Sequence, residues 1–170
     1  MKKIFLVKTI ACFCFLNSVV SNAQQLTEIP KAVKYSFMSR FRDAHASRWV
    51  KVLDKYVCTF SQGLYYRDAY FTGDGKFNGT GNYIIFDMLP GMVQNTINGS
   101  YSKFEIVELY QYDCSSDGLF FYAVLRNDNC ERVLKMTPDG DIVYCQKNKL
   151  HGSSNNLSDI AKIFKRIEKP

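Results

Sequence analysis

Two short stretches, Thr27-Glu28-Ile29-Pro30 and Asp87-Met88-Leu89-Pro90, decide how the chain is read. Each opens with a residue that commonly caps a helix and places a proline three positions later, in the first helical turn, where the missing amide hydrogen costs little. After both stretches, apolar residues recur every four positions and share one helix face: Val33, Phe37, Phe41 and Val93, Ile97, Tyr101. We therefore expect an amphipathic helix at the start of each half of the chain.

After each predicted helix, apolar and polar residues alternate with the period of β-strands. The predicted strands span 49–53, 56–60, 64–71 and 76–83 in the first half, and 104–112, 119–125, 131–137 and 141–145 in the second. Asp74-Gly75 and Asp139-Gly140 supply hairpin-turn chemistry at matching places. The sequence thus predicts an α+β fold of two tandem repeats, 27–83 and 87–145, each one helix plus a four-stranded antiparallel meander, with the helices on one sheet face.

The first 23 residues have the pattern of a signal peptide. Lys2 and Lys3 precede a mostly apolar stretch, 4–20, and small residues follow up to Ala23. A membrane anchor is less favoured, because Lys8 interrupts the apolar stretch and a spanning helix needs about 20 apolar residues. We expect cleavage after Ala23, a periplasmic or secreted protein with no membrane span after cleavage, one domain over 24–146, and a basic tail over 147–170.

The charge distribution argues against a nucleic-acid partner. The 170-residue chain has a formal net charge of +6, and three of its lysines lie in the predicted signal peptide. Most of the remaining excess lies in the tail, so the body lacks the basic stripe that a nucleic-acid surface needs. The tail also carries apolar residues at helical spacing, which predict a last amphipathic helix: Leu157, Ile160, Ala161, Phe164 and Ile167.

Four cysteines remain after signal cleavage, and four cysteines allow three pairings. No two of them have the close spacing of a zinc site, so no metal is expected. A hairpin centred on Asp139 brings Cys130 and Cys145 to the same end of the predicted sheet, and we expect them to form a disulfide. Cys58 is expected to be a buried thiol unless the turn that bears Cys114 folds over it.

The repeated signatures resemble those of PepSY-like secreted proteins common in Bacteroidetes, which are similar in fold to a beta-lactamase inhibitor protein. The resemblance covers about residues 27–145 and rests on short motifs: Ile29-Pro30, Phe41, Trp49, Tyr56, Cys58, Phe60, Asp74-Gly75, Leu89-Pro90, Tyr101 and Asp139-Gly140. It implies tandem helix-plus-sheet repeats with one open sheet face. It implies no enzymatic activity and carries over no catalytic residue. Apart from Cys58, the cysteines of the predicted mature chain lie outside the pattern, as does the last helix.

Strand alternation gives the open sheet face many tyrosines. If Tyr56, Cys58 and Phe60 face the helices, several others turn outward, and we expect these to be exposed and to bind a partner: Tyr66, Tyr70, Tyr110, Tyr112 and Tyr122. Tyrosine suits protein recognition, because it offers a large amphipathic contact area at low entropic cost. The alternative is that β-propensity alone explains them.

The leading functional hypothesis is an exported, non-enzymatic binding or inhibitor-like module that recognises a protein or cell-envelope ligand through this open face. A carrier of small molecules or peptides, with its pocket between the repeats, is the alternative. An enzyme is the least favoured class, because His45 and His151 are the only histidines and no nucleophile, base and orienting group can be assembled. No catalytic residue and no cofactor is predicted.

Overall fold

The computed structural model describes residues 28–149 of the chain. They form two α-helices, α1 (Lys31–Arg40) and α2 (Gly91–Tyr101), and a short 3₁₀ turn, η1 (Phe86–Met88). The strands are β1 (His45–Val52), β2 (Lys55–Gln62), β3 (Tyr65–Thr72), β4 (Phe77–Tyr83), β5 (Glu105–Cys114), β6 (Gly118–Arg126), β7 (Cys130–Met136) and β8 (Ile142–Lys149). The last strand extends three residues into the predicted basic tail.

All strands belong to one antiparallel sheet of eight strands in the order β1 to β8. The prediction of two helix-plus-four-strand repeats is therefore wrong, because β4 pairs directly with β5, from Gly79 opposite Cys114 to Tyr83 opposite Tyr110. This pairing has a physical reason. Two separate meanders would each leave an unpaired inner edge, whereas joining β4 to β5 satisfies the backbone groups of both edges.

Both helices begin one residue after a proline. Pro30 and Pro90 occupy the position before α1 and α2, and neither helix has a side-chain hydrogen bond to its first turn. The expectation that Asp87 caps the second helix is wrong, because Asp87 lies inside η1. The hairpin turns behave as expected: Gly75 and Gly140 have positive φ of 88° and 85°. A side chain at either glycine would collide with the carbonyl oxygen of a helix residue, Ala32 or Met92.

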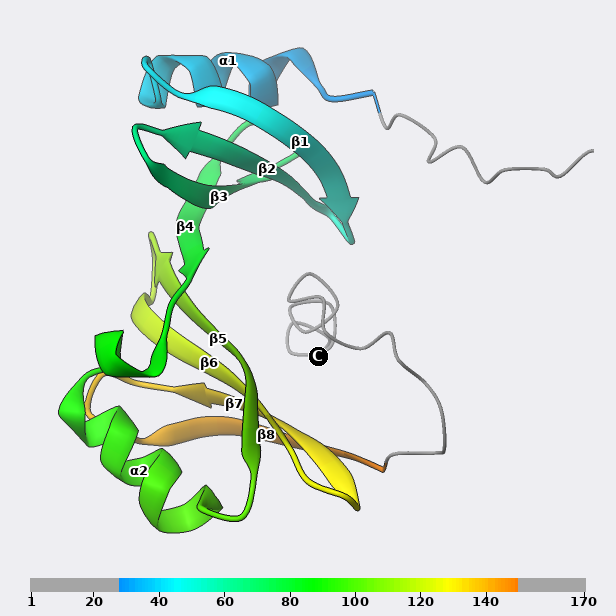
Figure 1. Ribbon diagram of the computed structural model, residues 1–170. Coiled ribbons are helices and arrows are strands. Elements are labelled where there is room, and N and C mark those ends of the chain that lie inside the picture. Colours follow the sequence, from blue (N-terminus) through cyan, green and yellow to red (C-terminus); the bar gives the residue numbers. More distant parts are fainter. Residues whose placement is uncertain (1–27, 150–170) are drawn as a thin grey trace, which may run out of the picture.

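The sheet is strongly curved, and both helices lie on its outer, convex side (Figure 1). Val33 and Phe37 of α1 pack on a cluster that includes Phe60 and Phe71. On the other half of the sheet, α2 packs on aliphatic residues from β5 to β7, which include Leu109, Leu125 and Leu134. The helices therefore cover two neighbouring parts of one sheet face.

The four cysteines within residues 28–149 are all free thiols. The predicted Cys130–Cys145 disulfide is wrong, because Cys130 lies opposite Lys149 and Cys145 lies opposite Leu134. This register separates the two cysteines by four positions along the strand, about 13 Å, whereas bridged Cα atoms lie within about 7 Å. Cys58 is fully buried and Cys114 partly exposed, and neither forms a disulfide.

Several predicted features lie outside the described residues: the signal peptide 1–23, His151 and the last helix over 157–167. Over residues 28–149, neither helix has the length and apolar character that a membrane crossing requires.

Candidate binding face

The concave side of the sheet, opposite the helices, carries the tyrosines that the sequence singled out. The strand register places Val57 opposite Tyr70, Tyr110 opposite Tyr122, and Tyr122 opposite Lys135. Residues directly opposite each other point to the same face of a sheet. The concave face therefore includes Tyr66, Tyr70, Tyr110, Tyr112 and Tyr122, as alternation along the strands predicts.

The predicted exposure of these tyrosines is wrong for four of the five. Tyr66 is 69% exposed, whereas Tyr70, Tyr110, Tyr112 and Tyr122 are each 5% exposed or less. The four buried rings belong to one apolar cluster with Val57, Val124 and Val133. Tyr70 of β3 and Tyr112 of β5 pack edge to face across β4, with ring centroids 5.1 Å apart. On this sheet, a side chain that points away from the helices is therefore not necessarily exposed to solvent.

A chain of side-chain hydrogen bonds links β2, β3 and β5 on this face. The Thr59 hydroxyl donates to Asp68 Oδ1 at 2.7 Å, and the Tyr110 hydroxyl donates to Asp68 Oδ2 at 2.9 Å. The Tyr70 and Tyr110 hydroxyl oxygens lie 2.8 Å apart and share a further hydrogen bond. One carboxylate oxygen of Asp68 therefore accepts a hydrogen bond from the adjacent strand β2, and the other accepts one from β5 across β4.

Tyr110 reaches Asp68 because the strand between them carries a glycine. A Cβ atom on Gly81 of β4 would lie 2.3 Å from the Tyr110 ring and 2.4 Å from its hydroxyl oxygen. The Tyr110 side chain thus lies directly over the backbone of β4, where an added side chain would displace it. The Gly79-Thr80-Gly81 segment has a packing role in this sheet.

Burial keeps both hydroxyls of this network protonated. Removal from solvent raises the pKa of Tyr70 well above its usual value, and the negative charge of Asp68 adds to the effect. The pKa of Tyr110 is also raised strongly, first by burial and then by its neighbours Tyr70 and Asp68. Both tyrosines are neutral hydrogen-bonding groups at physiological pH.

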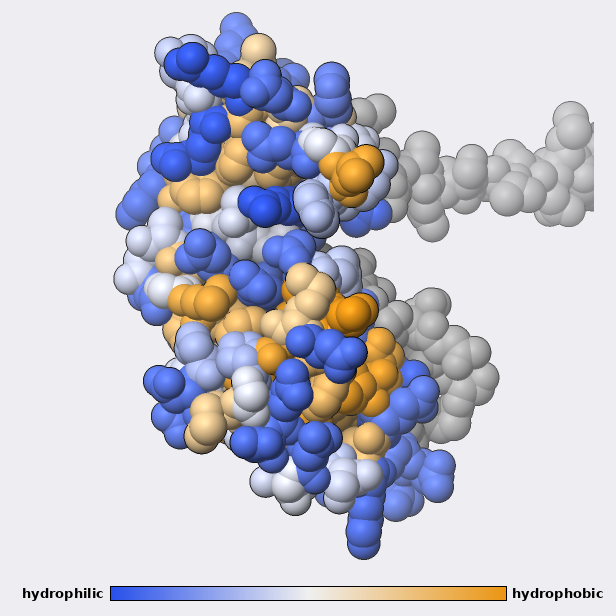
Figure 2. Space-filling model, turned by 60° about the vertical axis from the view of Figure 1, so that its left-hand side comes forward, coloured by the Kyte–Doolittle hydropathy of each residue, from blue (hydrophilic) through white to orange (hydrophobic). Residues whose placement is uncertain are grey.

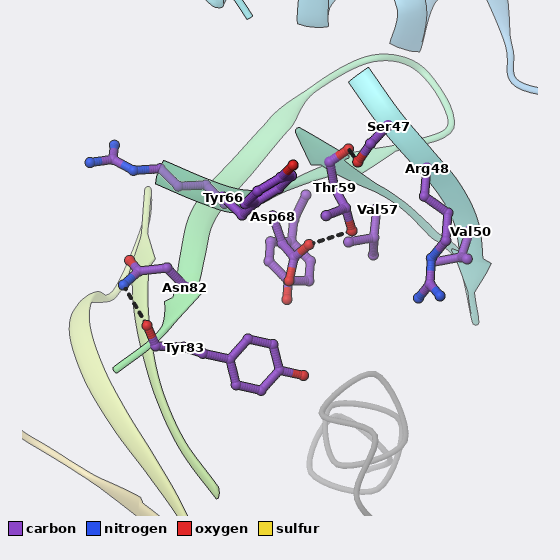
Figure 3. Close-up of a pocket in the computed structure, with 11 residues that line it drawn as sticks. Ser47, Arg48, Val50, Val57, Thr59, Tyr66, Asp68, Asn82 and Tyr83 are labelled. Carbon is purple, nitrogen blue, oxygen red and sulfur yellow. Dashed lines mark hydrogen bonds between the residues drawn. The ribbon is translucent and has the colours of Figure 1, made fainter. Parts of the chain in front are cut away.

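A hollow of about 390 Å³ opens over the first four strands of the concave face. Its wall and floor include Arg48, Val57, Thr59 and Asp68, whose side chains point to the same side of the sheet in Figure 3. Tyr66 and Tyr83 also line it, and the Tyr83 ring extends from β4 toward the other side chains. All of its described lining residues lie between Ser47 and Tyr83, so the hollow is not the pocket expected between two halves.

Sequence reasoning missed Tyr83 as a site residue. Tyr83 is 54% exposed and packs edge to face on Tyr110, with ring centroids 5.1 Å apart. The pairing of β4 with β5 places Tyr83 opposite Tyr110. Because the sequence signals did not reveal this pairing, they could not associate Tyr83 with the other tyrosines. Arg48 was missed as well, because the predicted first strand began at Trp49.

No metal centre forms within the part of the chain that the structure describes, since no three His, Cys, Asp or Glu side chains lie close enough to hold an ion. His45, at the start of β1, is exposed. The shape and side chains of the hollow over β1–β4 fit a ligand.

No protein-family model and no curated protein sequence matches the chain. Several solved structures match its fold. A protein from Bacteroides eggerthii described as periplasmic has a TM-score of 0.64 at 16% identity, covering 69% of this chain and 88% of that one. A DUF2874 family protein from Bacteroides ovatus has a TM-score of 0.64 at 17% identity, with 69% and 86% covered. A BLIP-like protein from Bacteroides fragilis has a TM-score of 0.62 at 13% identity, with 74% and 91% covered. The chain shares the fold of these proteins.

Proposed function

We propose that this protein is an exported, non-enzymatic binding module, inhibitor-like in its mode of action, that recognises a protein or cell-envelope ligand through its concave face. The observation that carries the proposal is the hollow over β1–β4, which has exposed tyrosines at its rim and a hydrogen-bonded carboxylate at its floor. The fold shared with a BLIP-like protein is compatible with this function.

The side chains around the hollow have the chemistry of a protein-recognition site. Tyrosine and arginine are the residues most enriched at the energetic centres of interfaces. Tyr66, Tyr83 and Arg48 provide both types around one depression. Tyr70 lines the hollow and packs in one apolar cluster with the buried tyrosines of β5 and β6, which supports these contacts from the side.

The polar groups of the hollow suit binding better than catalysis. A general acid or base works best with a pKa near the operating pH. Burial moves the pKa of Tyr70 and Tyr110 away from neutrality, and Asp68 already accepts two hydrogen bonds. The hydrogen bonds of this network hold the side chains of the binding surface in one arrangement.

The proposed location is the periplasm or the exterior of the cell. The signal-peptide pattern of residues 1–23 supports export, and a protein with the same fold is described as periplasmic. Membership of the PepSY-like secreted proteins is part of the same proposal and is supported by the shared fold with DUF2874 and BLIP-like proteins of Bacteroides.

The test compares how much partner protein is captured by the wild-type chain and by variants of its concave face. The mature chain, residues 24–170, is immobilised and incubated with a Bacteroides envelope extract, and bound protein is quantified by mass spectrometry. Tyr66→Ala with Tyr83→Ala should lower capture of the specific partner at least about tenfold, the effect expected when interface anchors are lost. Tyr35→Ala is the matched control, because Tyr35 is 76% exposed on α1, away from the concave face.

Two results would contradict the proposal. One is equal capture by the double variant and the control, which would place the interface elsewhere. The other is a small molecule of defined mass released from the purified native protein, with no captured protein, which would indicate a carrier.

A further inference from the structure

The apolar cluster of the concave face is buried like the core between two layers. Tyr110 is 0% exposed, and Val124 and Val133 are each 1% exposed. A side chain on a strand stands roughly perpendicular to the sheet, so its neighbours shield its flanks but a second layer is needed to cover its tip. Within residues 28–149, both helices lie on the opposite, convex side (Figure 1). The described residues therefore supply only one of the two layers.

We infer that the second layer is the C-terminal segment of this same chain, with residues 157–167 bound across the concave face. Its apolar residues recur at i, i+3, i+4, i+7 and i+10, which places them on one side of a helix: Leu157, Ile160, Ala161, Phe164 and Ile167. This apolar stripe matches the apolar cluster in chemistry. The inference goes beyond the proposed function and holds whether or not the hollow binds a partner.

The chain leaves the sheet at a place from which the segment can reach the cluster. β8 ends at Lys149, and the preceding residue, Asn148, lies on the concave side, where its amide nitrogen is 3.5 Å from Glu131 Oε1. Residues 150–156 span up to about 23 Å when extended, whereas the distance from β8 to β5 is three strand spacings, about 14 Å. A helix of residues 157–167 is about 16 Å long and covers roughly three to four strands.

Charge favours the same placement. The concave face of β3 to β5 carries three acidic side chains, Asp68, Glu105 and Glu108, and no basic one. On β6 and β7 the same face adds Arg126, Lys135 and Glu131. Residues 150–170 contain four basic and two acidic residues. A basic segment over β3 to β5 lowers the electrostatic cost of burying their carboxylates.

This placement gives the two parts of the concave face different occupants. The C-terminal segment covers the cluster over β3–β7, and the hollow with Tyr66 and Tyr83 at its rim stays beside it.

The decisive experiment is a cross-link in the otherwise unaltered mature chain, residues 24–170. Photoreactive benzoylphenylalanine replaces Phe164, and the products are digested and mapped by mass spectrometry. We expect intramolecular cross-links to peptides of β5, β6 or β7. The same group at Lys162, on the opposite side of the predicted helix, is the matched control and should give little of this product.

Three outcomes of this experiment would overturn the inference. They are cross-links to α1 or α2, cross-links that join two chains when isotopically labelled and unlabelled protein are mixed, and the absence of any cross-link to the sheet. The second would identify another copy as the occupant of the face.

An independent readout is nitration of tyrosines in the folded protein. In the wild type, Tyr65 and Tyr66 should react and Tyr110 and Tyr122 should resist. Phe164→Asp should raise nitration of Tyr110 and Tyr122 about tenfold, because it removes one large apolar contact from the covering layer. Lys162→Ser should leave nitration unchanged. Wild-type nitration in a folded Phe164→Asp variant overturns the inference, and if that variant fails to fold, the cross-link decides.

Discussion

Under α1 the convex face of the sheet packs aromatic rings, whereas under α2 it packs aliphatic side chains. The Phe37 ring of α1 lies 5.4 Å from Phe60 and 5.5 Å from Trp49, between ring centroids, with edge-to-face orientations. At the matching place on α2, Ile97 packs among Leu109, Leu125 and other residues. The two helices thus pack on the same sheet through different kinds of side chains. The helix-to-sheet arrangement depends on apolar volume and spacing more than on the identity of the side chains.

The concave side differs between the same two regions. Over β1–β4 it holds the hollow, while the clustered tyrosine and valine side chains concentrate over β5–β7. The outer surface differs as well: in Figure 2 apolar surface gathers on the half that holds β5–β8, and the half that holds β1–β4 is mostly hydrophilic in that view. The first four strands therefore provide the accessible site, and the last four provide much of the apolar support.

The largest expected effect comes from removing one helix anchor at each end of the sheet. Phe37→Ala should lower the free energy of unfolding by about 3 to 5 kcal/mol and Ile97→Ala by about 2 to 5 kcal/mol, because each leaves a cavity under its helix. Urea unfolding measures both. Trp49, the only tryptophan, reports on the first half through its fluorescence, and circular dichroism reports on the whole sheet.

Because β4 and β5 join the two halves, the two signals should change together in both variants. If Ile97→Ala shifted the circular dichroism transition and left the Trp49 transition in place, the halves would unfold separately. The comparison would then be between two independent units.

The next effect tests the contact that joins the halves on the concave face. Gly81→Ala should destabilise the protein by about 1 to 3 kcal/mol, because its methyl group would occupy the position of the Tyr110 ring. In a Tyr110→Ala background the same change should have a much smaller effect, which a double-mutant cycle measures. Gly99→Ala in α2 is the control, since no atom lies within 4 Å of its added Cβ and alanine favours a helix by up to about 1 kcal/mol. Equal losses at both glycines would contradict the steric explanation.

A smaller effect should appear at alkaline pH. Burial raises the pKa of Cys58 to about 12 and raises the pKa values of Tyr70 and Tyr110 above 10.0. The folded chain therefore keeps protons that the unfolded chain loses, and its stability should be constant from pH 7 to about 9 and fall at higher pH. Each buried tyrosine contributes a slope of up to about 1.4 kcal/mol per pH unit above its unfolded pKa.

Urea titrations at a series of pH values measure this slope. Tyr110→Phe should reduce it above about pH 10, the ordinary tyrosine pKa. Tyr65→Phe, at a site 71% exposed, should not change it. A stability that rises between pH 9 and 11 would refute the assignment.

The smallest perturbation is chemical labelling of the thiols, which compares one cysteine from each half. Cys145 on β8 is exposed and should be alkylated rapidly near neutral pH. Cys58 on β2 is buried and its pKa is raised, so the reagent cannot reach the thiol and little of it is deprotonated. It should react only after unfolding. Peptide mapping identifies the labelled sites. Rapid labelling of Cys58 in the folded chain, or a recovered Cys130–Cys145 disulfide, would contradict this difference.

Much of the local structure could be predicted from the sequence. Every predicted strand overlaps an observed one, and alternation placed Tyr70, Tyr110 and Tyr122 correctly on the face opposite the helices. The prediction failed at a β-bulge between Ile106 and Glu108. Ile106 packs on the helix-side cluster and Val107 on the concave cluster, the reverse of what alternation continued from Leu109 and Tyr110 predicts. An inserted residue reverses the alternation, and the sequence carries no clear signal for it.

The elements, their order and the face of most strand side chains could be predicted from the sequence, because these follow from short-range periodicity and turn chemistry. The pairing of β4 with β5 and the curvature of the sheet became visible only in the folded chain. Those two features made one sheet from two predicted repeats and brought outward tyrosines of both halves into one cluster. They depend on contacts between residues far apart in the chain, which local patterns do not encode.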